Sequence, residues 1–140
     1  MLIDRRILAG LAVAACVAAT PALAEDPAIT GVWSGSMRQI DVKAEKSYAM
    51  TVTLSGTTGV SEYPTLSCGG RWTRIAETLG HVIYSETITH GRFNEKLGTG
   101  CIDGIVIVQR KGNTLTLGWY ITFAGQPSAA TAVLKATTQK

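Results

Sequence analysis

The sequence predicts an all-β domain: a small antiparallel up-and-down barrel of about eight strands, stapled by one disulfide. Three observations support this fold class. Apolar and polar residues alternate with a period of two, no segment has apolar residues spaced as on a helix face, and short glycine-containing links separate the segments. Closing such strands into a barrel removes the exposed sheet edges. A β-sandwich is the alternative.

The first 24 residues have the pattern of an export signal. Arg5 and Arg6 precede an uncharged apolar run over 7–19, and small residues follow, ending at Ala24. The run is too short to cross about 30 Å of hydrocarbon, so we expect no transmembrane span. Cleavage after Ala24 would leave residues 25–140 as a single domain in the periplasm or outside the cell.

A second processing site competes with this one. The segment Val13-Ala14-Ala15-Cys16 resembles a bacterial lipobox, in which the cysteine is lipidated and becomes the new N-terminus. The alternative is therefore a lipoprotein anchored through Cys16.

The charge balance does not indicate a polyanion partner. The chain has 13 basic and 10 acidic residues; without residues 1–24 the numbers are 11 and 9, a net charge of +2. The basic residues form no run, so we expect no nucleic-acid binding.

Strands are expected along nearly the whole of the exported chain. Alternation is plainest where Tyr48, Met50, Val52 and Leu54 share one face, as expected for an antiparallel sheet with one wet face. Short links favour pairing between strands that are neighbours in sequence. The predicted strands cover residues 30–38, 47–55, 57–63, 68–76, 81–90, 101–109, 114–123 and 128–136.

Two cysteines remain if Cys16 leaves with the signal or carries the lipid. In an oxidising compartment we expect Cys68 and Cys101 to form a disulfide. The spacing is not that of a redox C-x-x-C pair, and no second Cys/His pair accompanies it, so neither a redox site nor a cofactor is expected.

Glu86 is the most informative titratable residue. Strand alternation places it between Tyr84 and Ile88 on an apolar face, where a carboxylate needs a partner. A short turn at 78–80 would bring Arg74 diagonally beside it. We therefore predict a structural pair of Glu86 with Arg74 or with a tyrosine, in preference to a catalytic carboxylate.

The other polar residues show no catalytic or metal-binding pattern. His81 and His90 fall on opposite strand faces, and His90 is about 13 Å along the strand from Glu86. No G-x-S-x-G motif occurs. We therefore expect no metal site, no catalytic residue and no enzymatic activity.

The segment Gly31-Val32-Trp33 matches the G-x-W pattern that opens lipocalin and avidin-like barrels. This resemblance to calycin-like folds implies that Trp33 plugs one barrel end, with a basic residue of the last strand lying across it. Lys135 is the basic residue available there, where those families usually have Arg.

A longer pattern covers nearly all of the exported chain. Tyr63-Pro64-x-Leu66-x-Cys68-Gly69-Gly70, then Tyr84-x-Glu86-x-Ile88-Thr89-x-Gly91, then Cys101-x-Asp103-Gly104, resembles a small secreted bacterial β-domain. That domain occurs alone behind a signal peptide or appended to larger proteins such as bacterial serine/threonine kinases. The resemblance implies fold and compartment but no activity, and the segment 93–100 looks like an insertion.

Three functional hypotheses follow. The first is a non-enzymatic binding module for a protein, a glycan or a small molecule. The second is an inhibitor of a hydrolase such as lysozyme or a protease. The third, ranked last, is an enzyme using Glu86, Asp103 or the histidines. The candidate interaction loop comprises Arg92, Phe93, Asn94, Glu95 and Lys96.

Overall fold

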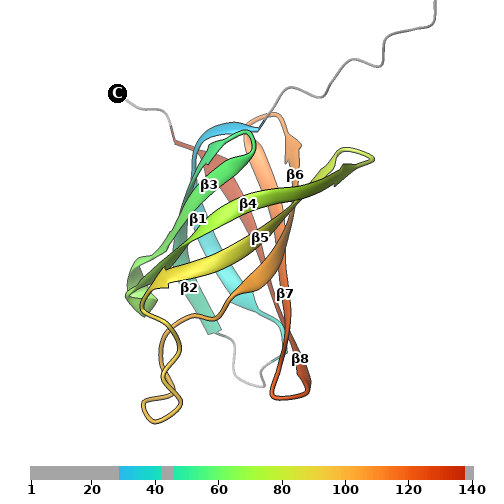
Figure 1. Cartoon of the computed structure of the whole chain (residues 1–140). Helices are drawn as coiled ribbons and strands as arrows, with labels where there is room; N and C mark the ends of the chain where they lie inside the picture. Colours follow the sequence, from blue (N-terminus) through green and yellow to red (C-terminus); the bar gives the residue numbers. More distant parts are fainter. Residues whose placement is uncertain (1–28, 42–45, 138–140) are drawn as a thin grey trace, which may run out of the picture.

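The computed structural model describes residues 29–41 and 46–137, which form one closed antiparallel barrel (Figure 1). Each strand pairs with its neighbour in sequence, and the last strand pairs with the first. The predicted up-and-down barrel is therefore confirmed, and the sandwich alternative is wrong. The predicted signal segment and Cys16 lie outside the described residues. The strands are β1 (Thr30–Gln39), β2 (Lys46–Ser55), β3 (Thr58–Tyr63), β4 (Cys68–Thr78), β5 (His81–His90), β6 (Gly104–Lys111), β7 (Thr114–Phe123) and β8 (Gln126–Ala136), with a short 3-10 turn, η1 (Pro64–Leu66), between β3 and β4.

The sixth strand begins three residues later than predicted. It starts at Gly104 and not at Cys101. The reason lies at Asp103, whose Oδ1 accepts the backbone N–H of Ile88 at 2.8 Å. A side chain thus takes the place that a strand carbonyl would have, and the preceding residues belong to the link.

The β4–β5 hairpin has the predicted register. Trp72 lies opposite Glu86, and Arg74 lies opposite Tyr84. The turn itself is shorter than predicted, but a bulge between Arg74 and Ala76 supplies the extra residue that restores the register.

One end of the barrel is plugged by Trp33, which is 2 % exposed and donates its Nε1–H to the Thr30 carbonyl at 3.2 Å. The prediction that Lys135 lies across it is wrong. Lys135 is exposed, since strand alternation turns it outward next to the inward Leu134. The cation over the ring is Arg110 of β6, 5.5 Å from its centre. We call this the closed end.

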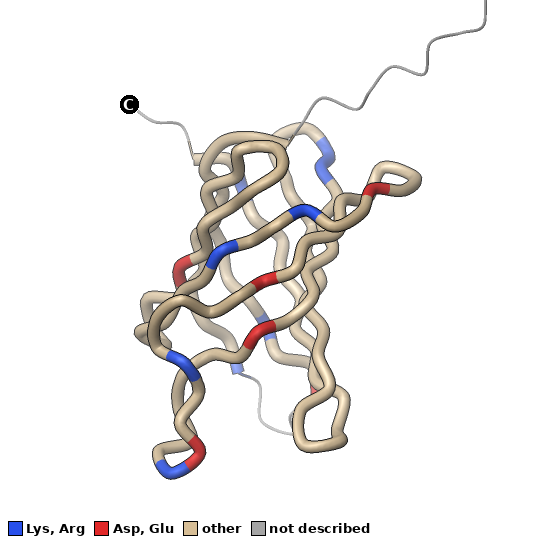
Figure 2. The backbone as a smooth tube through the Cα atoms, viewed as in Figure 1, with Lys and Arg blue, Asp and Glu red and all other residues tan. Residues whose placement is uncertain are grey.

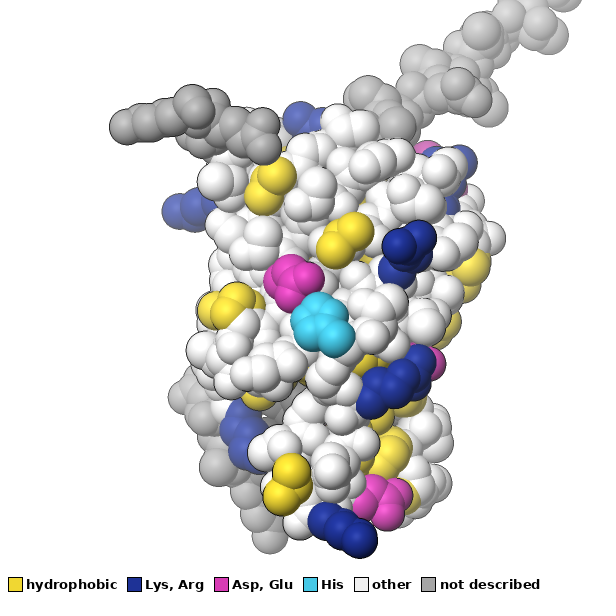
Figure 3. Space-filling view, turned by 60° about the vertical axis from the view of Figure 1, so that its left-hand side comes forward, with side chains coloured by type: hydrophobic (Ala, Val, Ile, Leu, Met, Phe, Trp, Pro, Cys, Tyr) yellow, Lys and Arg dark blue, Asp and Glu magenta, His cyan; other side chains and the backbone are white. Residues whose placement is uncertain are grey.

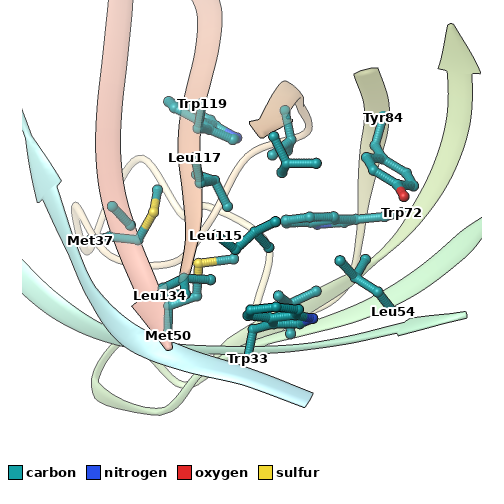
Figure 4. Packing of buried hydrophobic residues seen from close by; sticks show 14 of the residues in the cluster. Trp33, Met37, Met50, Leu54, Trp72, Tyr84, Leu115, Leu117, Trp119 and Leu134 are labelled. Carbon is teal, nitrogen blue, oxygen red and sulfur yellow. The ribbon is translucent and has the colours of Figure 1, made fainter. Parts of the chain in front are cut away.

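Large side chains fill the barrel next to the closed end. Figure 4 shows Trp33, Trp72 and Leu115 packed against one another with other buried residues, and none of these three is more than 2 % exposed. Val52, Val106, Val108 and Leu134 are fully buried in the same cluster. This half is a conventional packed core.

The outer surface has no large patch of one charge sign. Charges of both signs are scattered along the described chain (Figure 2), and the face in Figure 3 is mainly polar with mostly separate hydrophobic side chains. None of the helical segments in 29–41 and 46–137 is long and apolar enough to cross a membrane.

Candidate functional site

The other end of the barrel is hollow. A cavity of about 570 Å³ lies there, beneath the η1 turn and the link between β5 and β6, which projects past the barrel end in Figure 1. Its lining combines aromatic and apolar side chains with polar ones. The lining residues include Met37, Gln39, Lys46, Tyr48, Tyr63, Leu66, Glu86, Phe93, Ile102, Trp119 and Ser128.

Small side chains on β8 explain why this half is not filled. In the β7–β8 register Leu115 faces Leu134 near the closed end, whereas Trp119, towards the open end, faces Ala130. Ala130 and Ala132 are buried but too small to reach the barrel axis. The volume that leucines occupy at one end is therefore open at the other.

Glu86 is the one carboxylate among the described residues that line the cavity. It is 2 % exposed, as strand alternation predicts. Its Oε1 accepts hydrogen bonds from Ser61 Oγ at 2.5 Å, from Tyr63 Oη at 2.9 Å and from Trp72 Nε1 at 2.9 Å. Three neutral donors thus converge on one oxygen of the carboxylate.

The predicted Glu86–Arg74 pair is wrong. Arg74 instead binds Glu77 at 3.0 Å, and both side chains are about one-third exposed. Arg74 lies opposite Tyr84, towards the end of the barrel that Trp33 plugs, where a long cation reaches water more readily than the interior. The charge of Glu86 is thus held by neutral donors and by no described cation.

Two glycines make room beside Glu86. A Cβ on Gly104, which is opposite Glu86 on β6, would lie 2.2 Å from Trp119 Nε1. A Cβ on Gly70 of β4 would lie 2.7 Å from the Thr87 carbonyl oxygen. The bare backbone at Gly104 lets the Trp119 indole lie against it, so an aromatic ring lies beside the carboxylate.

The two tyrosines of the cavity stay neutral. Burial, followed by the charge of Glu86 and that of Asp41, raises the pKa of Tyr48 to about 12. Burial and the charge of Glu86, to which it donates, raise the pKa of Tyr63 well above its ordinary value. Their rings meet edge to face with centres 6.0 Å apart. Near Glu86 both rings therefore act as apolar walls with hydroxyl donors.

The link between β5 and β6 forms one side of the cavity mouth and is tied to the barrel. The sulfur atoms of Cys68 and Cys101 lie at bonding distance with Cα atoms 6.0 Å apart, so the predicted disulfide is confirmed. Phe93 contacts the ring of Phe123 on β7, with 5.3 Å between the ring centres. The disulfide thus holds the link over the cavity.

The predicted interaction loop divides into two parts. Arg92 pairs with Asp103 at 3.4 Å, and Phe93 lines the cavity. Asn94 closes the tip, since its Oδ1 accepts the backbone N–H of Lys96 and of Leu97. Phe93 and the returning residues 98–101 therefore line the cavity, whereas Glu95 is exposed at the tip.

The histidines do not join the site. The Nδ1 of His81 bonds the Leu79 carbonyl, and His90 contacts Glu62 on the surface at 3.3 Å. No group of three metal-ligating side chains occurs in the described part of the chain.

Sequence reasoning offered a tyrosine as one possible partner of Glu86, and Tyr63 is such a partner, but it missed Ser61 and Trp72 as donors. Ser61 and Tyr63 share one face of β3, and their alternation was readable, but nothing local indicates that this face meets Glu86. Trp72 was placed opposite Glu86 without being recognised as its donor. The small residues of β8 were the unused signal for the hollow half.

Comparison with known proteins adds no identification, since no family model, no curated protein and no solved structure matches the chain. The disulfide by itself fits a protein of an oxidising compartment, such as the periplasm or the extracellular space.

Proposed function

We propose that the protein is a non-enzymatic binding module that takes a small molecule into the open end of its barrel. The observation that carries the proposal is the division of the interior into a packed half and a cavity of about 570 Å³. Ligand pockets have this size, with apolar and aromatic walls and a few placed polar groups. Glu86 is such a group.

The residues of the site favour ligand binding over catalysis. A glycosidase-type mechanism needs two carboxylates, and the described lining has only Glu86. The oxygen Oε1 is already engaged by three donors. A rigid, disulfide-tied wall suits recognition.

The test is a screen of small molecules by thermal shift, followed by calorimetric titration of the hits. A ligand should raise the melting temperature of the wild type. The same ligand should not raise the melting temperature of Ser128→Trp, because this variant places an indole into the cavity from β8. Circular dichroism verifies that this variant is folded. Equal binding by Ser128→Trp would place the ligand elsewhere and refute the proposal.

Inhibition of a hydrolase is the second candidate, and the shape of the β5–β6 link favours it. Its tip is ordered by Asn94 and exposes Leu97 to 71 %. An ordered loop with an apolar tip can enter a cleft. In lysozyme and protease assays, Leu97→Ser should abolish inhibition. Leu79→Ser, at the 94 % exposed tip of another hairpin, should not.

We further propose that the protein acts in the periplasm or outside the cell after cleavage behind Ala24. The support is the pattern of the first 24 residues together with the disulfide. N-terminal sequencing of exported protein should begin at Glu25. Labelling by a palmitate analogue that Cys16→Ser abolishes would establish the lipoprotein instead.

A further inference from the structure

The charge of Glu86 has no counter-ion among the described residues. Its three partners, Ser61, Tyr63 and Trp72, are neutral donors. Cations of the barrel are placed elsewhere: Lys46 of the cavity lining is exposed, Arg74 pairs with Glu77, and Arg110 lies over the Trp33 ring. Hydrogen bonds stabilise the carboxylate but leave a net negative charge inside the barrel.

The second oxygen of this carboxylate faces the cavity. All three hydrogen bonds end on Oε1, and no described residue donates to Oε2. No fully buried side-chain oxygen in the described part of the chain lacks a hydrogen-bond partner. Because Oε2 has no protein donor in that part, it is therefore not fully buried. Since Glu86 is a lining residue, solvent or ligand reaches Oε2 from the cavity. This oxygen is a free acceptor at the base of an aromatic chamber.

The walls around this acceptor suit a cation with an apolar body. Tyr48, Tyr63, Phe93 and Trp119 line the same cavity. Aromatic faces attract an ammonium group, and they also bury hydrocarbon. Both tyrosines stay neutral for the reasons given above, and Lys46 is exposed at the rim. Among the described groups deep in the cavity, the only charge is therefore negative.

We propose that the ligand class of this cavity is a small amine in its protonated form, with the ammonium bound by Glu86 Oε2 and an apolar or aromatic body against the ring-lined walls. This assignment rests on the proposed small-molecule function and goes beyond it, since it names the group that is recognised. A ligand with an anionic group is disfavoured by the same carboxylate.

Three probes with a common phenyl body test the assignment: 2-phenylethylamine, 2-phenylethanol and 3-phenylpropanoate. Calorimetric titration of the wild type should show the amine binding about ten-fold or more tighter than the alcohol, and the acid weakest. Glu86→Gln should remove the advantage of the amine and leave the alcohol nearly unchanged. The matched control Glu62→Gln alters a surface carboxylate and should keep the preference.

The outcomes separate the two proposals. If the alcohol or the acid binds as tightly as the amine, or if Glu86→Gln retains the preference, the amine assignment is overturned. The small-molecule function survives that result if Ser128→Trp still blocks the probes. If no probe of any charge binds at millimolar concentration, both proposals fall.

Discussion

Replacing Glu86 by Gln tests whether the buried carboxylate supports the fold or serves the cavity. The amide oxygen can accept the bonds from Ser61, Tyr63 and Trp72 in place of Oε1. Each bond loses its charge assistance, about 1 kcal/mol, or about 3 kcal/mol for the three. Relief of an unpaired buried charge returns several kcal/mol. We therefore expect the free energy of unfolding to stay within about 1 kcal/mol of wild type.

Urea unfolding followed by tryptophan fluorescence measures this difference. Glu86→Ala provides the contrast, because it leaves three donors without an acceptor at about 1–3 kcal/mol each. We expect a loss of about 3 kcal/mol or more, reduced where cavity water reaches the donors. Glu62→Gln is the surface control, with an expected change below about 1 kcal/mol. A loss of about 3–5 kcal/mol in Glu86→Gln would show that the charge itself holds the barrel together, and would refute the reasoning.

Three further predictions concern the surroundings of this carboxylate. Arg74→Met should cost less than about 1 kcal/mol in urea unfolding, because its ion pair is partly exposed. The double variant Cys68→Ser/Cys101→Ser should lose about 4 kcal/mol on the chain-entropy model for a separation of 33 residues. Glu86→Gln should lower the pKa of Tyr48 from about 12 towards its ordinary value of 10.0, measured by tyrosinate absorbance. Since the folded pKa of Tyr48 is raised, its contribution to stability is complete below pH 10 and is lost as the pH rises towards 12.

Each of these has a clear contrary result. A loss of about 3–5 kcal/mol for Arg74→Met would indicate that Arg74 forms a buried pair with Glu86 after all. Unchanged stability of the double serine variant would mean that the link is held by its other contacts. An unshifted pKa of Tyr48 would show that burial and the charge of Asp41, and not the charge of Glu86, raise it.

The fold was predictable because its signals are local. Apolar side chains alternate with polar ones over residues 48–54 and again over 115–123, so they share one face of each strand. Closing the sheet into a barrel buries that face. The register of the β4–β5 hairpin followed from the short link between its strands, and so did the place of Trp72 opposite Glu86. The disulfide followed from counting cysteines.

The site was predictable only in part. Alternation correctly put Glu86 inside. Of its two predicted partners, Arg74 pairs with Glu77 instead, whereas a tyrosine, Tyr63, does donate to it. The true donors Ser61, Tyr63 and Trp72 come from β3 and β4, and their convergence depends on the stagger of the closed sheet. The cation over Trp33 likewise comes from β6 and not from the last strand.

The sequence by itself therefore determined the strands, the faces that point inward and the disulfide, because each depends on spacing along one segment or on composition. Only the tertiary structure decided which half of the barrel is hollow and which oxygen of Glu86 is left free. The first depends on side-chain volumes summed across the strands at one level of the barrel, and the second on which donors of β3 and β4 lie at that level. Residues far apart in the chain, such as Gln39 on β1 and Ser128 on β8, share that level only after closure.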